Sequence, residues 1–195
     1  MQSETFVFFG IVGSGKGTQV KLLMDFLKAK DGKGCVYAYP GNEYRKIIES
    51  NTQTSSLVKT VIEKGGLQPD FLTDSIFVGI LLKEISLDKH LIVDGYPRTI
   101  GQAQCFEEAI EFYGREKIKI ISLEVSREEV IKRMKLRGRQ DDTEEGIANR
   151  FDEYVNKVIP AMEYLKGKEN YKIYNINGEQ TVENVHKDII KALNF

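Results

Sequence analysis

The sequence predicts one α/β domain over residues 1–195, with a five-stranded parallel sheet and helices on both of its faces. Short runs of β-branched and aromatic residues alternate with longer stretches of helical periodicity, which is typical of a parallel sheet. A glycine-rich segment separates the first such run from the first helical stretch. A chain of 195 residues with 41% hydrophobic content suffices for one complete core, and two separate domains are not expected.

Strands, each followed by a helix, are expected near residues 5–9, 34–38, 90–93, 117–124 and 171–176. The first helix is expected to end at Asp31 and Gly32, because glycine favours the left-handed conformation that terminates helices. The helix after Pro69 is expected to be largely buried, since it carries apolar side chains at helical spacing: Leu72, Ile76, Phe77, Ile80, Leu81 and Ile85. Several phenylalanines are assigned to the core: Phe6, Phe8, Phe9, Phe71 and Phe77.

A different pattern between residues 40 and 69 predicts a helical insertion. One short helix is expected around residues 43–49, and a second carries the apolar side chains Leu57, Val58, Val61 and Ile62. Two glycines and Pro69 follow the second helix and end it. We interpret residues 40–69 as a flap inserted into the α/β domain.

The chain is organised around residues 10–18, which we interpret as a phosphate-binding loop. Its glycines allow backbone N–H groups to point at an anion, and the following helix presents its positive end. Lys16 is expected to be a solvent-facing cation that reaches the β- and γ-phosphates. Gly17 stands where this motif usually has serine or threonine, and Thr18 follows it, so Mg²⁺ is expected to be held by phosphates and water. A turn that binds nothing is the alternative, which the flanking strand and helix disfavour.

A second motif, residues 94–98, follows the strand near residues 90–93. Because the carboxyl ends of parallel strands meet at one edge of a sheet, this motif and the phosphate loop are expected to face one cleft. Asp94 suits Mg²⁺, directly or through water, and Arg98 suits a second anionic group. An ordinary turn at the Asp-Gly and Tyr-Pro pairs is the alternative.

Arginines later in the chain are expected to contact phosphate: Arg133, Arg137, Arg139 and Arg150. The first two share one face of a helix that begins with Ser126 and Glu129, a capping-box pair. Arg150 is placed on the next helix, which is expected to begin near residue 142 or 143. Asp141 and Asp142 can orient the guanidinium groups through paired hydrogen bonds.

Other ionisable side chains are assigned structural or solvent-exposed positions. Arg115 and Arg127 are assigned to solvated surfaces, and His90 and His186 to structural or exposed positions. No general base is required, because the oxygen of a phosphate acceptor is already anionic at neutral pH.

Composition argues against several classes of function. A net charge of −1 and a pI near 6.2 provide no general attraction to nucleic acid or to a membrane surface. Cys35 and Cys105 are far apart, and the chain has 2 histidines, so neither a disulfide framework nor a zinc site is indicated. Neither a leader nor a membrane span is expected, because the sequence shows no basic-plus-apolar pattern and no apolar stretch approaching the roughly 20 residues of a span. A soluble protein in a reducing, cytoplasmic setting is expected.

Taken together, these motifs resemble those of adenylate kinases and related nucleoside monophosphate kinases over the whole chain. The resemblance lies in residues 10–19, 41–45, 66–70, 94–102, 133–150 and 177–182. The first of these segments is similar to the family's G-x-P-G-x-G-K-G-T-Q, and residues 94–102 are similar to its D-G-F-P-R-T-x-x-Q. The resemblance implies a P-loop kinase fold whose flap at residues 40–69 binds the monophosphate and whose very short lid lies at residues 137–142. It implies reversible transfer of the γ-phosphoryl group of Mg-ATP to AMP, giving two ADP, by a cytoplasmic monomer.

The resemblance also implies roles for individual residues, with the nucleotides ATP, AMP and ADP as partners. Catalytic roles fall to Lys16, Arg98, Arg133, Arg139 and Arg150. ATP is expected at Gly13, Ser14, Gly15, Lys16, Gly17, Thr18, Arg133, Arg137, Gly178 and Val182. AMP is expected at Pro40, Gly41, Arg45, Gln68, Gly95, Arg98, Gln102, Arg139 and Arg150. Asp94 is expected to hold Mg²⁺ through water, and no zinc is expected.

Three departures from the family pattern bear on function. Val12 replaces a proline in the phosphate loop and removes no phosphate ligand, since proline has no N–H. Pro40 replaces a threonine or alanine beside the acceptor base, and Asn42 replaces an aspartate, so the preferred base is open. A single residue, Gly138, separates two lid arginines, so the lid is too short for the four metal ligands of some long-lid members.

Two other functions stay open on the residues alone: a UMP or CMP kinase, and a regulatory module of the same fold that binds nucleotide with weak catalysis. Thr99 and Gln102 favour adenine, because an amide can pair with its N1 and N6 edge, unless Gln102 is a surface helix residue. Tyr39 and Tyr44 flank the flap motif and are assigned to packing, with contact to the acceptor base as the alternative. A switch GTPase is set aside, because the chain lacks an Asn-Lys-x-Asp segment.

Overall fold

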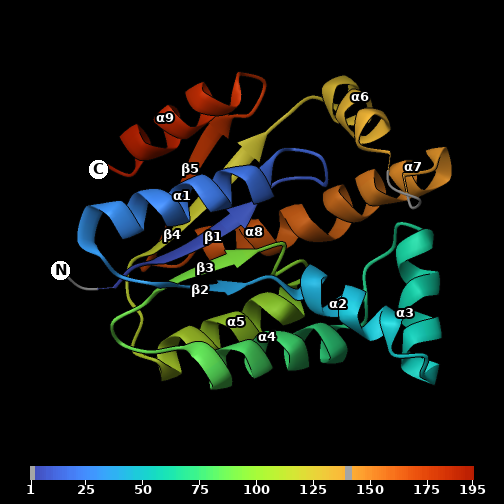
Figure 1. Ribbon diagram of the computed structural model, residues 1–195, viewed down its shortest axis with the longest axis horizontal. Helices are drawn as coiled ribbons and strands as arrows, with labels where there is room; N and C mark the ends of the chain where they lie inside the picture. Colours follow the sequence, from blue (N-terminus) through green and yellow to red (C-terminus); the bar gives the residue numbers. More distant parts are fainter. Residues whose placement is uncertain (1–2, 139–141) are drawn as a thin grey trace.

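The computed structural model of the chain describes residues 3–138 and 142–195. Within these residues the chain forms one five-stranded sheet in the order β2-β3-β1-β4-β5, and every neighbouring pair of strands is parallel (Figure 1). The strands are β1 (Thr5–Phe9), β2 (Cys35–Ala38), β3 (His90–Asp94), β4 (Ile118–Glu124) and β5 (Tyr171–Asn177). The predicted parallel sheet and the positions of its strands are confirmed.

Helices cover both faces of the sheet, and the alternation of side chains along β1 shows why. Phe6 and Phe8 belong to a cluster with α1 (Lys16–Asp31) and α9 (Val182–Ala192) on one face. Val7 and Phe9 belong to a cluster on the other face, with α4 (Asp70–Glu84), α5 (Ile100–Phe112) and α8 (Ile159–Lys166) (Figure 1). Because both faces are covered, β1 is buried at every position, as expected for a central parallel strand.

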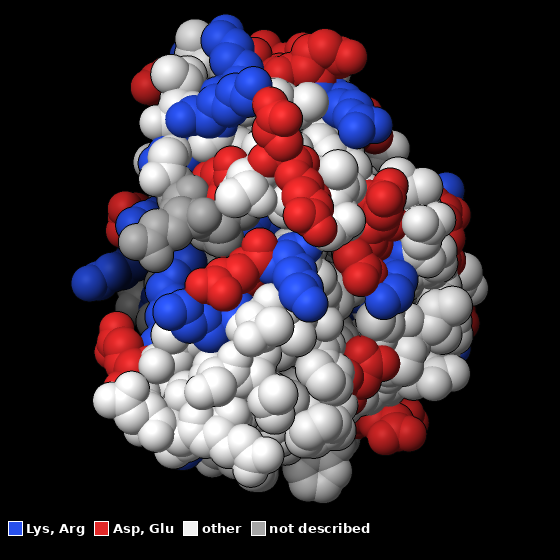
Figure 2. Space-filling view, turned by 90° about the vertical axis from the view of Figure 1, so that its right-hand side faces the viewer, with Lys and Arg blue, Asp and Glu red and all other residues white. Residues whose placement is uncertain are grey.

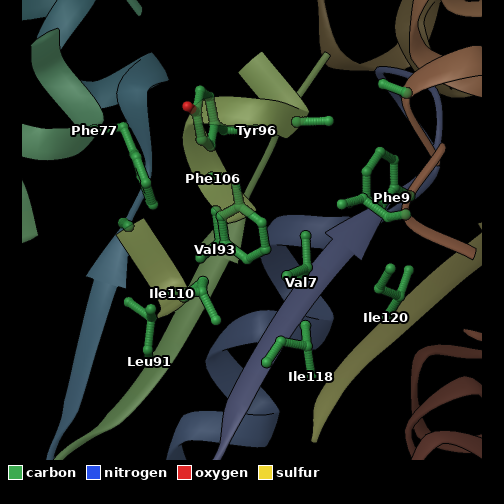
Figure 3. Close-up of a cluster of buried hydrophobic side chains, with 14 of the residues drawn as sticks. Val7, Phe9, Phe77, Leu91, Val93, Tyr96, Phe106, Ile110, Ile118 and Ile120 are labelled. Carbon is green, nitrogen blue, oxygen red and sulfur yellow. The ribbon is translucent and has the colours of Figure 1, made fainter. Parts of the chain in front are cut away.

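Aromatic stacking organises the second cluster. Figure 3 shows Phe77, Tyr96 and Phe106 packed beside Val93 of β3. The rings of Phe77 and Tyr96 are stacked with their centroids 4.3 Å apart, and the Tyr96 hydroxyl donates to Asp74 at 2.8 Å. Burial of three aromatic side chains makes this cluster a large contributor to stability.

The remaining helices lie at the carboxyl edge of the sheet (Figure 1). They are α2 (Pro40–Glu49), α3 (Gln53–Glu63), α6 (Arg127–Arg137) and α7 (Glu144–Glu153), and a π-helical turn at Tyr154–Val158 joins α7 to α8. Both predicted flap helices are therefore confirmed. The first begins at Pro40 rather than near residue 43, because the fixed φ of proline suits the first position of a helix.

Burial of α4 is less complete than the sequence predicts. Phe77 and Leu81 are buried, but the other four predicted apolar positions are only partly so. Phe71 is 74% exposed, so its assignment to the core is wrong. The reason is geometric, because α4 forms an outer layer and presents one side to solvent.

Two further assignments concern basic side chains. Arg115 is wrongly assigned to a solvated surface, because its side chain is partly buried and donates to the carbonyl oxygens of Ser86 and Lys89 at 2.8 and 2.9 Å. His90 is structural, with an exposed fraction of 1%. Its Nδ1 accepts from the Glu4 N–H at 3.0 Å, so Nε2 carries the proton and faces Asp31 at 3.2 Å.

Cys35 and Cys105 are both free thiols. In the part of the chain that the structure describes, no three His, Cys, Asp or Glu side chains gather as a metal site would require. A membrane-crossing helix would have to be longer or more apolar than any helix among these residues.

We predict that Phe77→Ala lowers the free energy of unfolding by about 3 to 5 kcal/mol, because it leaves a cavity in the aromatic cluster. Phe71→Ala on the same helix is the matched control, and its effect is expected to stay below about 0.5 kcal/mol. Urea denaturation measures both. Equal losses in the two variants would contradict this description of the core.

Candidate functional site

The phosphate loop connects β1 to α1, and its shape depends on glycine. Gly10, Gly13 and Gly15 have φ values of 140°, 94° and 97°, a region that L side chains rarely adopt. A Cβ at Gly10 would also lie 2.7 Å from Ser14 Oγ and 3.0 Å from the Leu123 carbonyl oxygen. The chain therefore turns tightly from the strand and presents the N-terminus of α1 at the carboxyl edge of the sheet, as an anion site requires.

Lys16 lies inside the loop rather than facing solvent. Its Nζ donates to the carbonyl oxygens of Gly10 and Ile11 at 2.6 and 3.0 Å. Burial lowers the pKa of Lys16 from 10.5 to about 8; the nearby Asp94 opposes this shift, and Arg98 and Arg137 add to it. The expectation of a solvent-facing cation is thus wrong, because the loop folds around its own lysine.

The other loop residues differ in their exposure. Gly17 and Thr18 are exposed on the first turn of α1, while Ser14 is buried. Among the described residues, the Ser14 hydroxyl oxygen has no hydrogen-bond partner. A buried hydroxyl without a partner is costly, so a ligand at this loop would meet an unsatisfied polar group.

Asp94 lies beside the loop, as predicted. It ends β3 and stands opposite Phe8 in the parallel register, and a Cβ at Gly17 would lie 4.0 Å from its Oδ2. That oxygen accepts a hydrogen bond from the Tyr37 hydroxyl at 2.9 Å. One carboxylate suits a Mg²⁺ ion that takes its other ligands from phosphate and water, which fits the absence of a hydroxyl at Gly17.

Residues 95–102 follow β3 and lie next to Asp94 at the carboxyl edge of the sheet. Arg98 donates from Nε to the Gly95 carbonyl oxygen at 2.7 Å, and its backbone N–H donates to Gln102 Oε1 at 2.8 Å. Gln102 donates in turn to Asp70 at 2.9 Å and is 1% exposed. Gln102 is therefore a buried, oriented amide, and the alternative of a surface helix residue is wrong.

A cavity of about 370 Å³ lies between the flap, the loop and Arg98. Its lining includes every described residue at which the sequence predicts AMP: Pro40, Gly41, Arg45, Gln68, Gly95, Arg98, Gln102 and Arg150. Residues 10–12 of the phosphate loop and both flap tyrosines, Tyr39 and Tyr44, also line it. Tyr44 hydrogen bonds Thr73 at 2.6 Å, which supports its assignment to packing. The cavity is large enough for a small polar molecule.

Asp142 gathers two of the predicted arginines. Arg137 donates to its two oxygens at 3.0 and 2.7 Å, and Arg150 donates to Oδ1 at 2.6 Å. Although burial raises the pKa of Asp142, the hydrogen bonds from these arginines outweigh it and hold the pKa below its usual range. The paired orientation predicted for Asp142 is confirmed. Arg139 and Asp141 lie outside the described residues.

Arg133 connects the phosphate loop with the end of the edge strand β5. It donates to the Gly178 carbonyl oxygen at 2.9 Å and to the Ser14 carbonyl oxygen at 3.4 Å. Glu129 Oε1 holds its Nε at 2.8 Å. Gly178 follows β5, and the Val182 carbonyl oxygen accepts from Gln19 on α1 at 2.9 Å. The ATP-binding residues predicted near the start and near the end of the chain therefore lie together around the phosphate loop.

The capping box predicted for α6 is half right. Ser126 accepts from the Glu129 N–H, but the Ser126 N–H donates to Glu179 instead of Glu129. Because Glu179 takes the capping position, the Glu129 carboxylate is left to hold Arg133.

Figure 2 faces this end of the molecule. Basic and acidic side chains are interleaved across its middle, and its lower part, over the flap helices, is largely uncharged. Residues 50–58 contain no charged side chain, which agrees with this view. Because the charges on this face are mixed, the cations of the site attract an anion only at short range, from within the cavity.

A protein-family model described as adenylate kinase matches residues 8–170. Relatives named adenylate kinase cover the chain almost completely. One from Flavobacterium psychrophilum is 33% identical over 96% of this chain and 97% of its own length. One from Bacteroides fragilis is 35% identical over 96% of both chains, and one from Thermosipho africanus is 29% identical over 96% and 98%.

The chain belongs to the adenylate kinase family. The predicted fold, family and enzyme class are confirmed, and the chain is a phosphotransferase of the nucleoside monophosphate kinase type with adenylate kinase activity. Neither alternative, a pyrimidine monophosphate kinase or a weakly catalytic regulatory module, gains support from these relatives.

The sequence alone did not reveal several side chains that support the site of this adenylate kinase. Tyr37 holds Asp94, Glu129 holds Arg133, and Gln19 joins α1 to Val182. Tyr37 is separated from Asp94 by 57 positions, and their contact depends on the pairing of β2 with β3. A helical i, i+4 spacing between Glu129 and Arg133 is the one signal that could have been used.

We predict that the contribution of Lys16 to stability rises with pH. Between about pH 8 and 10.5 the unfolded chain binds more protons at this residue than the folded chain, so raising the pH through this window favours folding. The free energy of unfolding of the wild type, minus that of Lys16→Met, should therefore increase from pH 7 to pH 10 in urea denaturation. Lys21→Met, an exposed position on the same helix, is the control. A difference that falls with pH would contradict the assignment.

Proposed function

We propose that the phosphate loop holds ATP and the adjoining cavity holds AMP, so that the γ-phosphoryl group passes between them at the carboxyl edge of the sheet. The observation that carries this proposal is that residues 10–12 of the loop form one wall of a cavity whose lining contains the predicted AMP residues. Two bound nucleotides would meet end to end there. Alignment of two reactants accounts for a large part of catalysis in phosphoryl transfer.

On the ATP side, the loop N–H groups and Lys16 bind the β- and γ-phosphates. Lys16 exchanges its bonds to two loop carbonyl oxygens for phosphate oxygens, which keeps the ammonium group in the same place. Arg133 and Arg137 neutralise the transferring group, and Gly178 and Val182 flank the adenine. Arg133 already joins the loop to Gly178, which supports this arrangement.

On the AMP side, Arg45, Arg98, Arg139 and Arg150 bind the monophosphate. Pro40, Gly41, Gln68, Gly95 and Gln102 surround the nucleoside. Gln102 keeps one N–H and one lone pair in addition to its bonds to Asp70 and Arg98, so its amide retains both groups that adenine needs. No general base is required, because the acceptor phosphate is an anion.

Asp94 would hold Mg²⁺ beside the phosphates. When bound, the ion neutralises charge on the β- and γ-phosphates. Tyr37 fixes the orientation of the carboxylate by donating to Oδ2. This assignment rests on the position of Asp94 beside the first turn of α1.

We further propose that the flap at residues 40–69 and the lid at residues 137–142 close over the nucleotides to exclude water. Asn149 of α7 donates to the Lys64 carbonyl oxygen of the flap at 2.8 Å, so the flap touches the helix that carries Arg150. A monomer in a reducing cytoplasmic compartment is proposed, because one chain supplies the described site residues and its two cysteines are free thiols.

We predict that AMP is the preferred acceptor. With Mg-ATP fixed, kcat/KM should be higher for AMP than for CMP, UMP, GMP or dTMP, and two ADP should form for each ATP consumed. Pro40 offers no hydroxyl to the base, which weakens selectivity by about 1 to 3 kcal/mol without inverting it. A higher kcat/KM for CMP or UMP would contradict the AMP assignment, and nucleotide binding without transfer to any acceptor would contradict the enzymatic function.

A further inference from the structure

Arg45 is an exposed cation of the cavity wall, and its guanidinium group is held by uncharged partners. NH1 donates to Asn42 Oδ1 at 2.8 Å, and NH2 donates to the Tyr39 hydroxyl at 3.3 Å. The guanidinium carbon lies 5.6 Å from the centre of the Tyr39 ring, within the range of a cation–π contact. The long side chain of Arg45, which is otherwise exposed to solvent, is thus held in place by Asn42 and Tyr39.

Tyr39 is itself fixed. Its ring stacks on Tyr37 with centroids 5.6 Å apart and an angle of 19° between the planes. It also lies across Gly41, where a Cβ would come within 2.5 Å of Tyr39 Cζ. A larger residue at Gly41 would have to push the ring of Tyr39 aside. The Tyr37 hydroxyl donates to Asp94, so the stacked pair is anchored to the end of β3.

We propose that Tyr39 is a positioning residue that holds Arg45 toward the acceptor phosphate. This inference rests on the proposed function, which places the AMP phosphate at Arg45. Tyr39 and Asn42 carry no charge, so they orient the guanidinium group without neutralising it, whereas a carboxylate would compete with the phosphate. Holding the cation before AMP arrives reduces the conformational entropy lost on binding.

The stack also connects the two substrate sites. Tyr37 holds Asp94 on the ATP side, and Tyr39 holds Arg45 on the AMP side. The two rings therefore set the spacing between the carboxylate assigned to Mg²⁺ and the cation assigned to the acceptor.

Steady-state kinetics with AMP varied and ATP saturating test the proposal. Tyr39→Phe removes the hydroxyl and keeps the stack, and it should raise KM for AMP about 2- to 10-fold with little change in kcat. Tyr39→Leu removes both contacts and should raise this KM further than Tyr39→Phe does. Tyr113→Leu, a half-buried tyrosine that packs on Phe112 at the end of α5, is the control.

A double-mutant cycle separates positioning from packing. In an Arg45→Ala background, Tyr39→Phe should have no further effect on KM for AMP, because the group that it orients is absent. An equal effect with and without Arg45, or none in the wild-type background, would overturn the role of Tyr39 and leave the proposed function in place. If Arg45→Ala itself leaves KM for AMP unchanged, the assignment of the acceptor phosphate to Arg45 fails as well.

Discussion

The site depends on holding several cations close together before any phosphate is bound. Like charges at short range repel, so each described cation needs a nearby oxygen. The chain supplies them from its own backbone and side chains. Lys16 donates to loop carbonyl oxygens, Arg98 to Gly95, Arg45 to Asn42 and Tyr39, Arg133 to Gly178 and Glu129, and Arg137 and Arg150 to Asp142. Phosphate oxygens can replace the carbonyl oxygens, whereas a buried carboxylate stays in place and keeps its arginines oriented.

The sheet order brings these groups to one place. The pairing of β1 with β3 sets the phosphate loop beside Asp94, and β2 beyond β3 carries the flap and its tyrosines to the same edge. The pairing of β4 with β5 brings Gly178 within reach of Arg133 on the helix after β4. The connection that leaves β1 and the one that leaves its neighbour β3 run in opposite directions across the sheet. Ligands of open α/β sheets are expected at the carboxyl ends of two such strands.

Local patterns predicted the strands and the flap helices, because glycine spacing, apolar periodicity and strand ends act over short distances. The residues of the cavity wall followed from the resemblance to adenylate kinases and not from local patterns. Contacts between distant segments were not predictable. Glu179 displaces Glu129 from the cap of α6, and Tyr37 on β2 reaches Asp94 at the end of the neighbouring strand β3. Phe71 and Lys16 were misjudged for a related reason, since the exposure of an apolar or charged side chain depends on what the rest of the chain places over it.

The central claim is that oxygens of the chain hold the cations in position for the phosphates, and Asp142 is the clearest instance. The most direct test is kcat for Asp142→Asn, with Asp152→Asn on the exposed side of α7 as the matched control and urea denaturation to verify folding. The account predicts that kcat falls by about 10- to 100-fold in the first variant, because misplaced arginines no longer meet the transferring group, and stays near wild type in the second. A folded Asp142→Asn protein with unchanged kcat would contradict it.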